Sequence, residues 1–465
     1  MSTASAPRQA LQPPTAIPSR KKSVRLTLWP LVAATFFMVS GGTYGIEDIV
    51  HGAGYGRAIL FLALTPILWS LPAAFMIGEL SSALPHEGGY YSWVRRAMGN
   101  FWGFQEAWLS LAASIFDMAI YPTLFVLYLT RLFPWFNQGH RGWMVGLAVV
   151  TACVVLNIAG VKVVSTTSLW LFFLLSAPFA LIVVLSPFKY AGLLHAVTTP
   201  TTSKVDIIGG LLICMWNYMG WDNASTIATE VERPQRTYPR AMVAAVVLVT
   251  LTYVVPVAAV WMTGLPAGAW ETGSWADIAG LLGGPLLRIG LVLGGMMSAF
   301  GMFNALVMSY SRLPLAMAQD GMLPRVFARL NGRRAPWVAI LALALGWAMC
   351  LGLGFERLVT IDILLYGASL TLEFVALVFL RFREPQLARP FRVPGGIVGA
   401  IAIGIPPVLL LGFDLVRSET EYVLGMSSFK FGMILIAAGA VVYFLNHALK
   451  PQGWTVAKEK PQPAA

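Results

Sequence analysis

Long apolar segments, separated by short polar ones, cover most of the chain. Many of them contain about twenty residues, the length that a helix needs to cross a hydrocarbon core of about 30 Å. The pattern predicts an all-α polytopic membrane protein with about twelve transmembrane helices. We expect these helices near residues 30–54, 57–83, 102–132, 141–161, 165–187, 205–230, 240–263, 284–311, 336–354, 357–381, 397–416 and 428–448.

The polar segments complete this outline. Residues 1–29 are rich in Pro and Ser and carry five Lys and Arg residues, which predicts a disordered cytoplasmic tail. Residues 449–465 form a second, shorter cytoplasmic tail. Residues 86–99 are short and mixed in polarity, so we expect an interfacial helix there, between the second and third spans.

The distribution of basic residues tests this arrangement, because Lys and Arg are retained on the cytoplasmic side of a membrane. With a cytoplasmic N-terminus, 23 of the 32 Lys and Arg residues fall on the cytoplasmic side. The pattern predicts a multi-pass protein of the cell (plasma) membrane with both termini in the cytoplasm.

Composition agrees with this class and argues against a soluble enzyme. Hydrophobic residues make up 57% of the chain and charged residues only 11%, whereas soluble domains are about a quarter charged. The net charge of +11 would suggest nucleic-acid binding in a soluble protein, but here it follows from the topology. We therefore expect the lipid bilayer, and no nucleic acid, as a partner.

Two of the predicted spans are interrupted by residues that do not favour helices. The first contains SGGTYG at residues 40–45, and the sixth contains NYMGWDN at residues 217–223. Exposed backbone is not tolerated in lipid, so such breaks are expected around an enclosed or water-filled cavity. The alternative is that the glycines only let helices pack closely, as we expect for those of the eighth span.

Paired broken spans, one in each half of the chain, are typical of secondary transporters built from inverted repeats. We therefore expect a first five-helix repeat at residues 30–187 and a second, inverted one at residues 205–381. Two further helices follow at residues 397–448.

Acidic residues lie at the depth of the breaks. Glu47 and Asp48 follow the first break, Asp222 follows the second, and Asp117 lies near the middle of the third span. Carboxylates inside a membrane are costly and usually face a cavity or a partner, yet few basic residues lie at the same depth. The pattern indicates a cationic ligand, protons, or both.

Other interpretations of these acids stay open. Glu47 and Asp48 can stabilise the start of a half-helix, and Asp222 or Asn223 can cap the second one. In that first turn the two acids would also disfavour a ligand that bears only an anionic group. Four glutamates lie toward span ends, where gates or interfacial pairs are the simpler interpretation. These are Glu79, Glu106, Glu230 and Glu373.

No catalytic arrangement competes with this interpretation. The five histidines are scattered, and the sequence has no metal-ligand spacing, nucleophile elbow or phosphate-binding loop. We therefore expect no enzyme, no metal, no cofactor and no ATP-driven pump.

Motifs along residues 30–450 resemble those of the amino acid–polyamine–organocation (APC) superfamily, most closely the polyamine uptake transporters of plants and protozoa. They are SGG at 40–42, GIED at 45–48, WSLP at 69–72, GEL at 78–80, PHEGGY at 85–90, FWGFQ at 101–105, Asp117 with YP at 121–122, WNY at 216–218, WDN at 221–223, EVERP at 230–234, DGMLP at 320–324 and RPFRVP at 389–394. The chain departs from the plant members at Thr43 and Tyr44, where Pro-Phe is expected.

This resemblance implies a LeuT-type fold, with discontinuous helices 1 and 6 and alternating access around them. It also implies a permease for amino acids or polyamines, commonly a proton symporter. We expect H⁺ as the coupling ion, carried by Glu47 or Asp117, whereas a sodium site would need carbonyls and hydroxyls from spans 1 and 8.

Our hypothesis is a secondary active transporter for a cationic amine, in which carboxylates meet ammonium groups and aromatic rings cover the alkyl part. Cation–π contacts would add about 1–2 kcal/mol each when desolvated. The alternatives are a neutral amino acid exchanger of the same superfamily and a membrane amine sensor that does not transport. The predicted substrate-binding residues are Gly41, Gly42, Thr43, Tyr44, Gly45, Glu47, Asp48, Asp117, Tyr121, Trp216, Asn217, Tyr218, Trp221 and Asp222.

Overall fold

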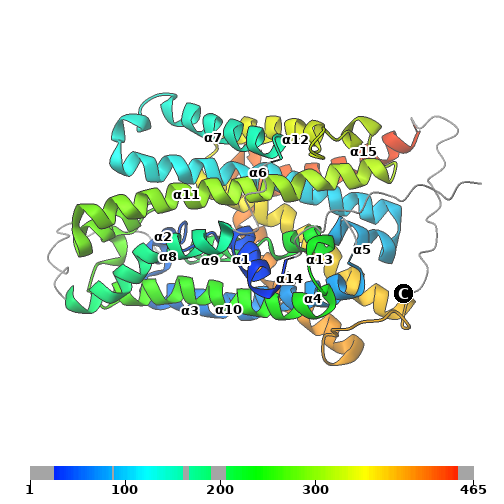
Figure 1. Cartoon of the computed structure of the whole chain (residues 1–465), viewed down its shortest axis with the longest axis horizontal. Coiled ribbons are helices and arrows are strands. Elements are labelled where there is room, and N and C mark those ends of the chain that lie inside the picture. The colour runs from blue at the N-terminus through cyan, green and yellow to red at the C-terminus, as the bar shows by residue number, and fades with distance from the viewer. Residues whose placement is uncertain (1–25, 86–87, 161–166, 190–205, 449–465) are drawn as a thin grey trace, which may run out of the picture.

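The computed structural model describes residues 26–85, 88–160, 167–189 and 206–448, which form a bundle of helices running nearly parallel to one axis (Figure 1). The α-helices are α1 Leu28–Val39, α2 Glu47–Ala53, α3 Tyr55–Thr65, α4 Leu71–Ala83, α5 Gly89–Met98, α6 Asn100–Leu132, α7 Arg141–Ile158, α8 Thr167–Leu185, α9 Ile207–Asn217, α10 Pro234–Trp261, α11 Trp275–Gln319, α12 Trp337–Cys350, α13 Phe355–Arg383, α14 Gly396–Thr420 and α15 Ser428–Ala448.

Shorter elements connect these helices. A π-helical turn, η1 Pro66–Ser70, joins α3 to α4 within one continuous helical stretch. The 3₁₀ segments are η2 Pro134–Asn137, η3 Ser186–Lys189, η4 Trp221–Glu230, η5 Ala267–Ala269 and η6 Arg325–Ala328. A two-residue hairpin, β1 Tyr422–Val423 paired with β2 Met426–Ser427, links α14 to α15.

Nine helical stretches within the described residues are long and apolar enough to cross a membrane, and α1 and α12 are shorter apolar helices. This composition agrees with the predicted all-α membrane class. The predicted tails fall on residues 1–25 and 449–465, which lie outside the described part, while α1 begins at Leu28 within the segment expected to be tail.

The centre of the bundle is formed by α6, α11 and α13. In the most apolar part of α6, 72% of the residues are buried, compared with 17% in α14 and in α15. The outer helices expose large apolar side chains, such as Val398 at 76% and Leu409 at 67%. An apolar exterior suits helices that face lipid tails, because lipid is as apolar as the protein core.

The broken elements α1, α2 and α9 lie between the upper and lower helices of the bundle in Figure 1, and α13 packs against α9. Helix α5 lies at the end of the bundle where α15 also ends (Figure 1). It begins at Gly89 and so confirms a short helix in the segment predicted at residues 86–99.

Helix α11 differs from its prediction, because it spans residues 275–319 rather than 284–311. Gly284 interrupts it with a non-helical φ of 75°, and Pro285 follows. The predicted span begins at this Gly-Pro step, whereas in the structure a short helical segment, residues 275–283, precedes it. Beyond residue 311 the helix continues to the end of the bundle that holds α5.

Candidate functional site

The two predicted helix breaks are present. The chain is not helical at residues 40–46, between α1 and α2, or at residues 218–220, between α9 and η4. The glycines of both breaks have φ values between 61° and 119°, a region that strongly favours glycine. The prediction of two interrupted helices is therefore confirmed. These glycines are Gly41, Gly42, Gly45 and Gly220.

The breaks are joined to each other by Asn217. Its side-chain Nδ2 donates to the carbonyl of Gly45 at 3.1 Å, and its own carbonyl accepts from the Tyr253 hydroxyl at 3.0 Å. The two segments also approach closely at Gly220, where a β-carbon would lie 2.9 Å from the carbonyl oxygen of Met38. A larger residue at this position would push the breaks apart.

Neighbouring helices satisfy the open backbone of the first break. The hydroxyl of Ser298 on α11 donates to the carbonyl of Gly41 at 2.5 Å. The hydroxyl of Thr43 donates to the carbonyl of Thr252 on α10 at 2.7 Å. The N–H of Gly42 donates to the Ser40 side chain. Such partners replace the helical hydrogen bonds that the break gives up.

Glu47 and Asp48 stand in the first turn of α2, as expected for residues that stabilise a helix start. The carboxylate of Glu47 is fully buried and accepts from the N–H of Gly45 at 2.8 Å and of Gly273 at 3.0 Å. The Tyr128 hydroxyl also donates to it. All of these partners belong to the chain, so Glu47 ties the first break to α6 and to the loop before α11.

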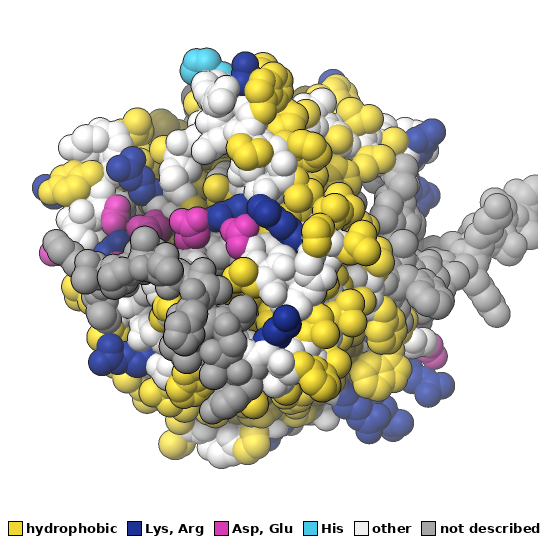
Figure 2. All heavy atoms as spheres, turned by 90° about the vertical axis from the view of Figure 1, so that its left-hand side faces the viewer, with side chains coloured by type: hydrophobic (Ala, Val, Ile, Leu, Met, Phe, Trp, Pro, Cys, Tyr) yellow, Lys and Arg dark blue, Asp and Glu magenta, His cyan; other side chains and the backbone are white. Residues whose placement is uncertain are grey.

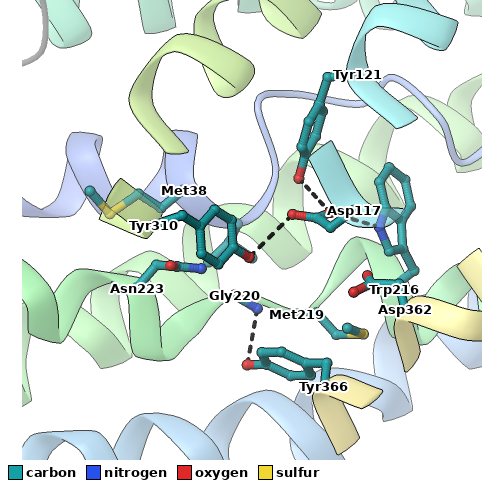
Figure 3. A pocket seen from close by; sticks show the side chains of 11 residues that line it. Met38, Asp117, Tyr121, Trp216, Met219, Gly220, Asn223, Tyr310, Asp362 and Tyr366 are labelled. Atoms are coloured by element: carbon teal, nitrogen blue, oxygen red, sulfur yellow. Dashed lines mark hydrogen bonds between the residues drawn. The ribbon is translucent and has the colours of Figure 1, made fainter. Parts of the chain in front are cut away.

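A small cavity lies beside the breaks, with Asp117 of α6 in its wall (Figure 3). The Asp117 carboxylate accepts from the Tyr121 hydroxyl at 3.0 Å, the Tyr310 hydroxyl at 3.3 Å and the Trp216 indole N–H at 3.4 Å. Three helices, α6, α9 and α11, thus meet around one carboxylate. The lining residues are Met38, Val39, Asp117, Tyr121, Trp216, Met219, Gly220, Asn223, Tyr310, Asp362 and Tyr366.

A second carboxylate, that of Asp362 on α13, lines the same cavity. Its side chain is 2% exposed, and within the described residues it accepts no hydrogen bond. No Lys, Arg or His is among the described residues that line this cavity. Two buried carboxylates therefore face one space that lacks a positive charge.

The cavity has a volume of about 20 Å³, enough for one water molecule and too small for an organic amine. The N–H of Gly220 donates to the Tyr366 hydroxyl at 3.1 Å along one wall (Figure 3). A ligand can therefore be admitted only if the helices around the breaks move apart.

The structure places other predicted residues next to the cavity rather than in its wall. The Asp222 carboxylate accepts from the Tyr366 hydroxyl at 2.6 Å and lies against the N–H groups that open η4. The Trp221 indole donates to the carbonyl of Tyr218 at 2.7 Å. Tyr44 packs edge-on against Tyr128, with 5.2 Å between the ring centroids. Of the predicted side chains, Asp117, Tyr121 and Trp216 line the cavity.

Comparison with known proteins identifies the kind of molecule that carries this site. Residues 32–438 match the model of the amino acid permease family. The chain belongs to this family. Family membership makes the protein a membrane transporter of the APC superfamily, which confirms the predicted resemblance and the expectation that it is not an enzyme.

Named relatives cover most of the permease. The polyamine transporter RMV1 of Arabidopsis thaliana is 34% identical over 92% of this chain and 87% of its own length. The polyamine transporter PUT1 of Oryza sativa subsp. japonica is 34% identical over 93% and 80%, respectively. The serine/threonine exchanger SteT of Bacillus subtilis is 25% identical over 80% and 85%.

The permease also has a large open pocket of about 810 Å³ at the end of the bundle opposite α5. Four acidic residues line it together with two basic ones, Arg131 and Arg357, and Figure 2 shows acidic side chains in a row across this end, with basic ones beside them. The rings of Trp216, in the cavity wall, and Phe355, in the pocket wall, lie edge to face at 5.5 Å. The walls of the two spaces are therefore in contact at this ring pair. The acidic residues are Asp48, Glu271, Glu356 and Glu421.

Asp362, Tyr310 and Tyr366 of this permease are not among the residues predicted from the sequence. A signal for two of them exists, because Asp362 and Tyr366 lie four residues apart, one turn of a helix. Asp362 is also an acid within a predicted span, the criterion that identified Asp117. Tyr310 carries no such signal, because a lone tyrosine in a span is usually a packing residue.

Proposed function

We propose that this permease takes a polyamine, or another amine with two or more ammonium groups, into the cell by proton-coupled alternating access. The observation that carries the proposal is the cavity beside the helix breaks. Asp117 and Asp362 are both buried there, and no basic side chain of the described residues lines the walls. Two buried carboxylates without a cation are costly, and an ammonium ligand would remove that cost.

The two carboxylates have different roles in the proposal. Asp117 is fixed by three donors, so its oxygens are oriented before a ligand arrives. Asp362 has no donor among the described residues and is left for an ammonium group. The faces of Trp216 and Tyr121 would lie along the ligand and add cation–π contacts of about 1–2 kcal/mol each. An anionic ligand group would find no basic partner.

The remaining predicted residues form the moving parts around this site. The glycine-rich break between α1 and α2 and the break after α9 are joined by Asn217, so one cannot shift without the other. Opening them would bring backbone groups and Asp222 to the ligand. Glu47 would act as an anchor for the outer half of the first break rather than as a contact to the ligand.

Substrate would reach the cavity from the pocket lined by Asp48, Glu271, Glu356 and Glu421. With four acidic and two basic residues in its lining, the pocket would carry a net negative charge, which favours amines over anions before they bind. The Trp216–Phe355 ring pair would then act as the outer gate. The two rings would have to move apart before an amine could enter the small cavity.

The arrangement of the chain in the membrane follows the same proposal. We infer twelve spans in two inverted five-helix repeats, at residues 30–187 and 205–381, with two helices appended, as in the LeuT-type fold. The end that carries α5 would face the cytoplasm together with both termini, because most Lys and Arg residues fall there. The acidic pocket would then open to the outside of the cell membrane.

Uptake into proteoliposomes tests the function. Labelled putrescine, spermidine and a panel of neutral amino acids are compared with and without an inward proton gradient, in the wild type and in Asp362→Asn. We expect uptake of polyamines by the wild type and a large loss in the variant. Uptake of neutral amino acids that is insensitive to Asp362→Asn would instead support exchange of neutral amino acids and defeat the proposal.

A further inference from the structure

A second pair of buried carboxylates lies away from the cavity, on the same two helices. Glu106 of α6 and Glu373 of α13, here called the inner glutamate pair, are both fully buried. Each stands eleven residues from the cavity carboxylate of its own helix, Asp117 and Asp362, respectively. At a rise of 1.5 Å per residue, both are displaced by about 16 Å toward the end that carries α5.

The pair is almost without hydrogen-bond partners. The hydroxyl of Ser369 donates to one oxygen of Glu106 at 2.5 Å. Among the residues described, the other oxygen of Glu106 and both oxygens of Glu373 accept no hydrogen bond. Three unpartnered carboxylate oxygens thus point into the packed interior between the two helices.

The groups that face the pair offer no compensating charge. They are Asp222 from η4, Tyr90 from α5 and Tyr366 from α13. Tyr90 is itself hydrogen-bonded to Ser110 of α6 at 2.8 Å. Among the described residues, no Lys, Arg or His forms a hydrogen bond with either glutamate. Two charged carboxylates so close together and without a cation would be very unfavourable in this environment.

Tyr366 and Asp222 stand between the cavity and the pair, and no hydrogen bond of the described residues joins either of them to the two glutamates. The Tyr366 hydroxyl lines the cavity and donates to Asp222 at 2.6 Å. Asp222 in turn is the charged neighbour that both glutamates share. Neither glutamate lines the small cavity or the open pocket, and both side chains are fully buried, so the pair suits a proton better than an organic ligand.

We infer that the inner glutamate pair is the site that carries the coupling proton. The inference rests on the proposed function, because it assigns the driving ion of that transport. A carboxyl proton reaches the pair from the cavity by way of Tyr366 and Asp222, and the neutral pair allows the helices to close on this side. When this side opens to water, the carboxylic acid ionises and its proton leaves with the substrate.

Replacement of each glutamate by glutamine tests the inference, because glutamine imitates the neutral acid but cannot release a proton. Glu106→Gln and Glu373→Gln are reconstituted with the membrane potential held at zero. For one proton per substrate, a gradient of one pH unit can drive about tenfold accumulation in the wild type. We expect both variants to lose this accumulation and the accompanying acidification of the vesicle interior, while exchange of labelled for unlabelled putrescine continues.

Two further variants separate coupling from folding. Ser369→Ala removes the only described donor to the pair, so the pH dependence of uptake should shift to higher pH with the protein still folded. Asp414→Asn changes another buried carboxyl, hydrogen-bonded to Ser418 on α14, and should leave coupling unchanged. Folding of every variant is checked by its thermal unfolding in detergent.

The outcomes are distinct. Glutamine variants that still accumulate putrescine with the wild-type response to pH overturn the inference. So do folded variants that lose exchange together with accumulation, because the pair would then serve substrate passage. A wild type that accumulates polyamine without any response to pH overturns the inference but leaves polyamine transport intact. A wild type that moves only another amine, with the coupling lost in the variants, defeats the polyamine proposal and supports the proton site.

Discussion

At the scale of single residues, the buried carboxylates of the permease differ in how many hydrogen bonds they accept. Asp117 accepts three hydrogen bonds, whereas Asp362, in the same cavity, accepts none from the described residues. The Glu47 carboxylate is fully used by its neighbours. Satisfied buried acids hold a structure together, and unsatisfied ones point to something that binds.

Asp362→Asn should therefore weaken substrate binding without weakening the fold. Loss of one buried charge contact costs about 2 kcal/mol or more, which raises the KM for putrescine more than tenfold. Thermal unfolding of the variant should be unchanged or shifted upward, because an unpaired buried charge is removed. Asp117→Asn, in contrast, disturbs three hydrogen bonds and should lower both stability and uptake. A wild-type KM in Asp362→Asn would contradict the assignment.

Gly41 illustrates a backbone requirement of the first break. Its φ of 61° is unfavourable for residues with a β-carbon, and a β-carbon would also collide with the side chains of Met302 and Ser298. Gly41→Ala should lower stability by about 1–3 kcal/mol and abolish uptake. Gly290→Ala is the matched control, because a β-carbon there meets nothing within 4 Å, and it should behave as the wild type. Thermal unfolding and putrescine uptake of both variants check this expectation.

These residues show how far the sequence could predict the site. Asp117, Tyr121 and Trp216 were predicted and do line the cavity, because acids and aromatics near a break stand out in an apolar chain. Asp362 was missed although it carried the same signal. Tyr310 was not predictable, because its role depends on which face of α11 meets α6, and that is set by tertiary packing.

At the scale of elements, the helix breaks were predicted in the right places because glycine runs are rare in the middle of apolar spans. The contact between the breaks was not, since the pairing of Asn217 with Gly45 joins segments 172 positions apart. The inner glutamate pair was likewise visible only as single acids near span ends. Its partnership arises because α6 and α13 pack side by side with equal spacing of their acids.

An exposed ion pair connects helix α5 to the end of α13. The Arg96 guanidinium donates to both oxygens of Glu384, at 2.9 and 2.7 Å, and these contacts hold the pKa of Glu384 below its ordinary value. The folded state therefore favours the charged carboxylate. The resulting stability is present above the ordinary glutamate pKa of about 4.3 and is lost as the pH falls through the lowered value.

Glu384→Gln should accordingly lower stability by about 0.2–1 kcal/mol near neutral pH, since exposed ion pairs contribute little. The difference from the wild type should stay constant from about pH 7 to about pH 5 and shrink as the pH falls through about 4 and below. Thermal unfolding in detergent across this range measures it, and added salt should reduce it as well. A difference in stability that stays constant even below pH 4 would show that the Arg96–Glu384 contact does not stabilise the fold through charge.

At the scale of the whole molecule, three features follow one another along the bundle. The described structure has an open acidic pocket at one end, a cavity of about 20 Å³ at the centre and the buried inner glutamate pair toward the other end. In the proposed orientation, this asymmetry corresponds to a transporter whose outer side is open and whose inner side is packed. Alternating access then requires the cavity to lose contact with the acidic pocket before the inner side opens. The order of these events can be measured by the accessibility of a residue in the pocket wall.

Thr123 reports on this order, because it lines the acidic pocket two residues after Tyr121 of the cavity. In a variant whose native cysteines are replaced by serine, Thr123→Cys should react with a water-soluble thiol reagent in the absence of substrate. Putrescine should slow the reaction as the outer side closes. Adding Phe355→Ala removes one ring of the Trp216–Phe355 pair, so protection by putrescine should weaken while basal labelling stays high. Labelling that is unaffected by substrate in the first variant would show that this end of the bundle does not move during transport.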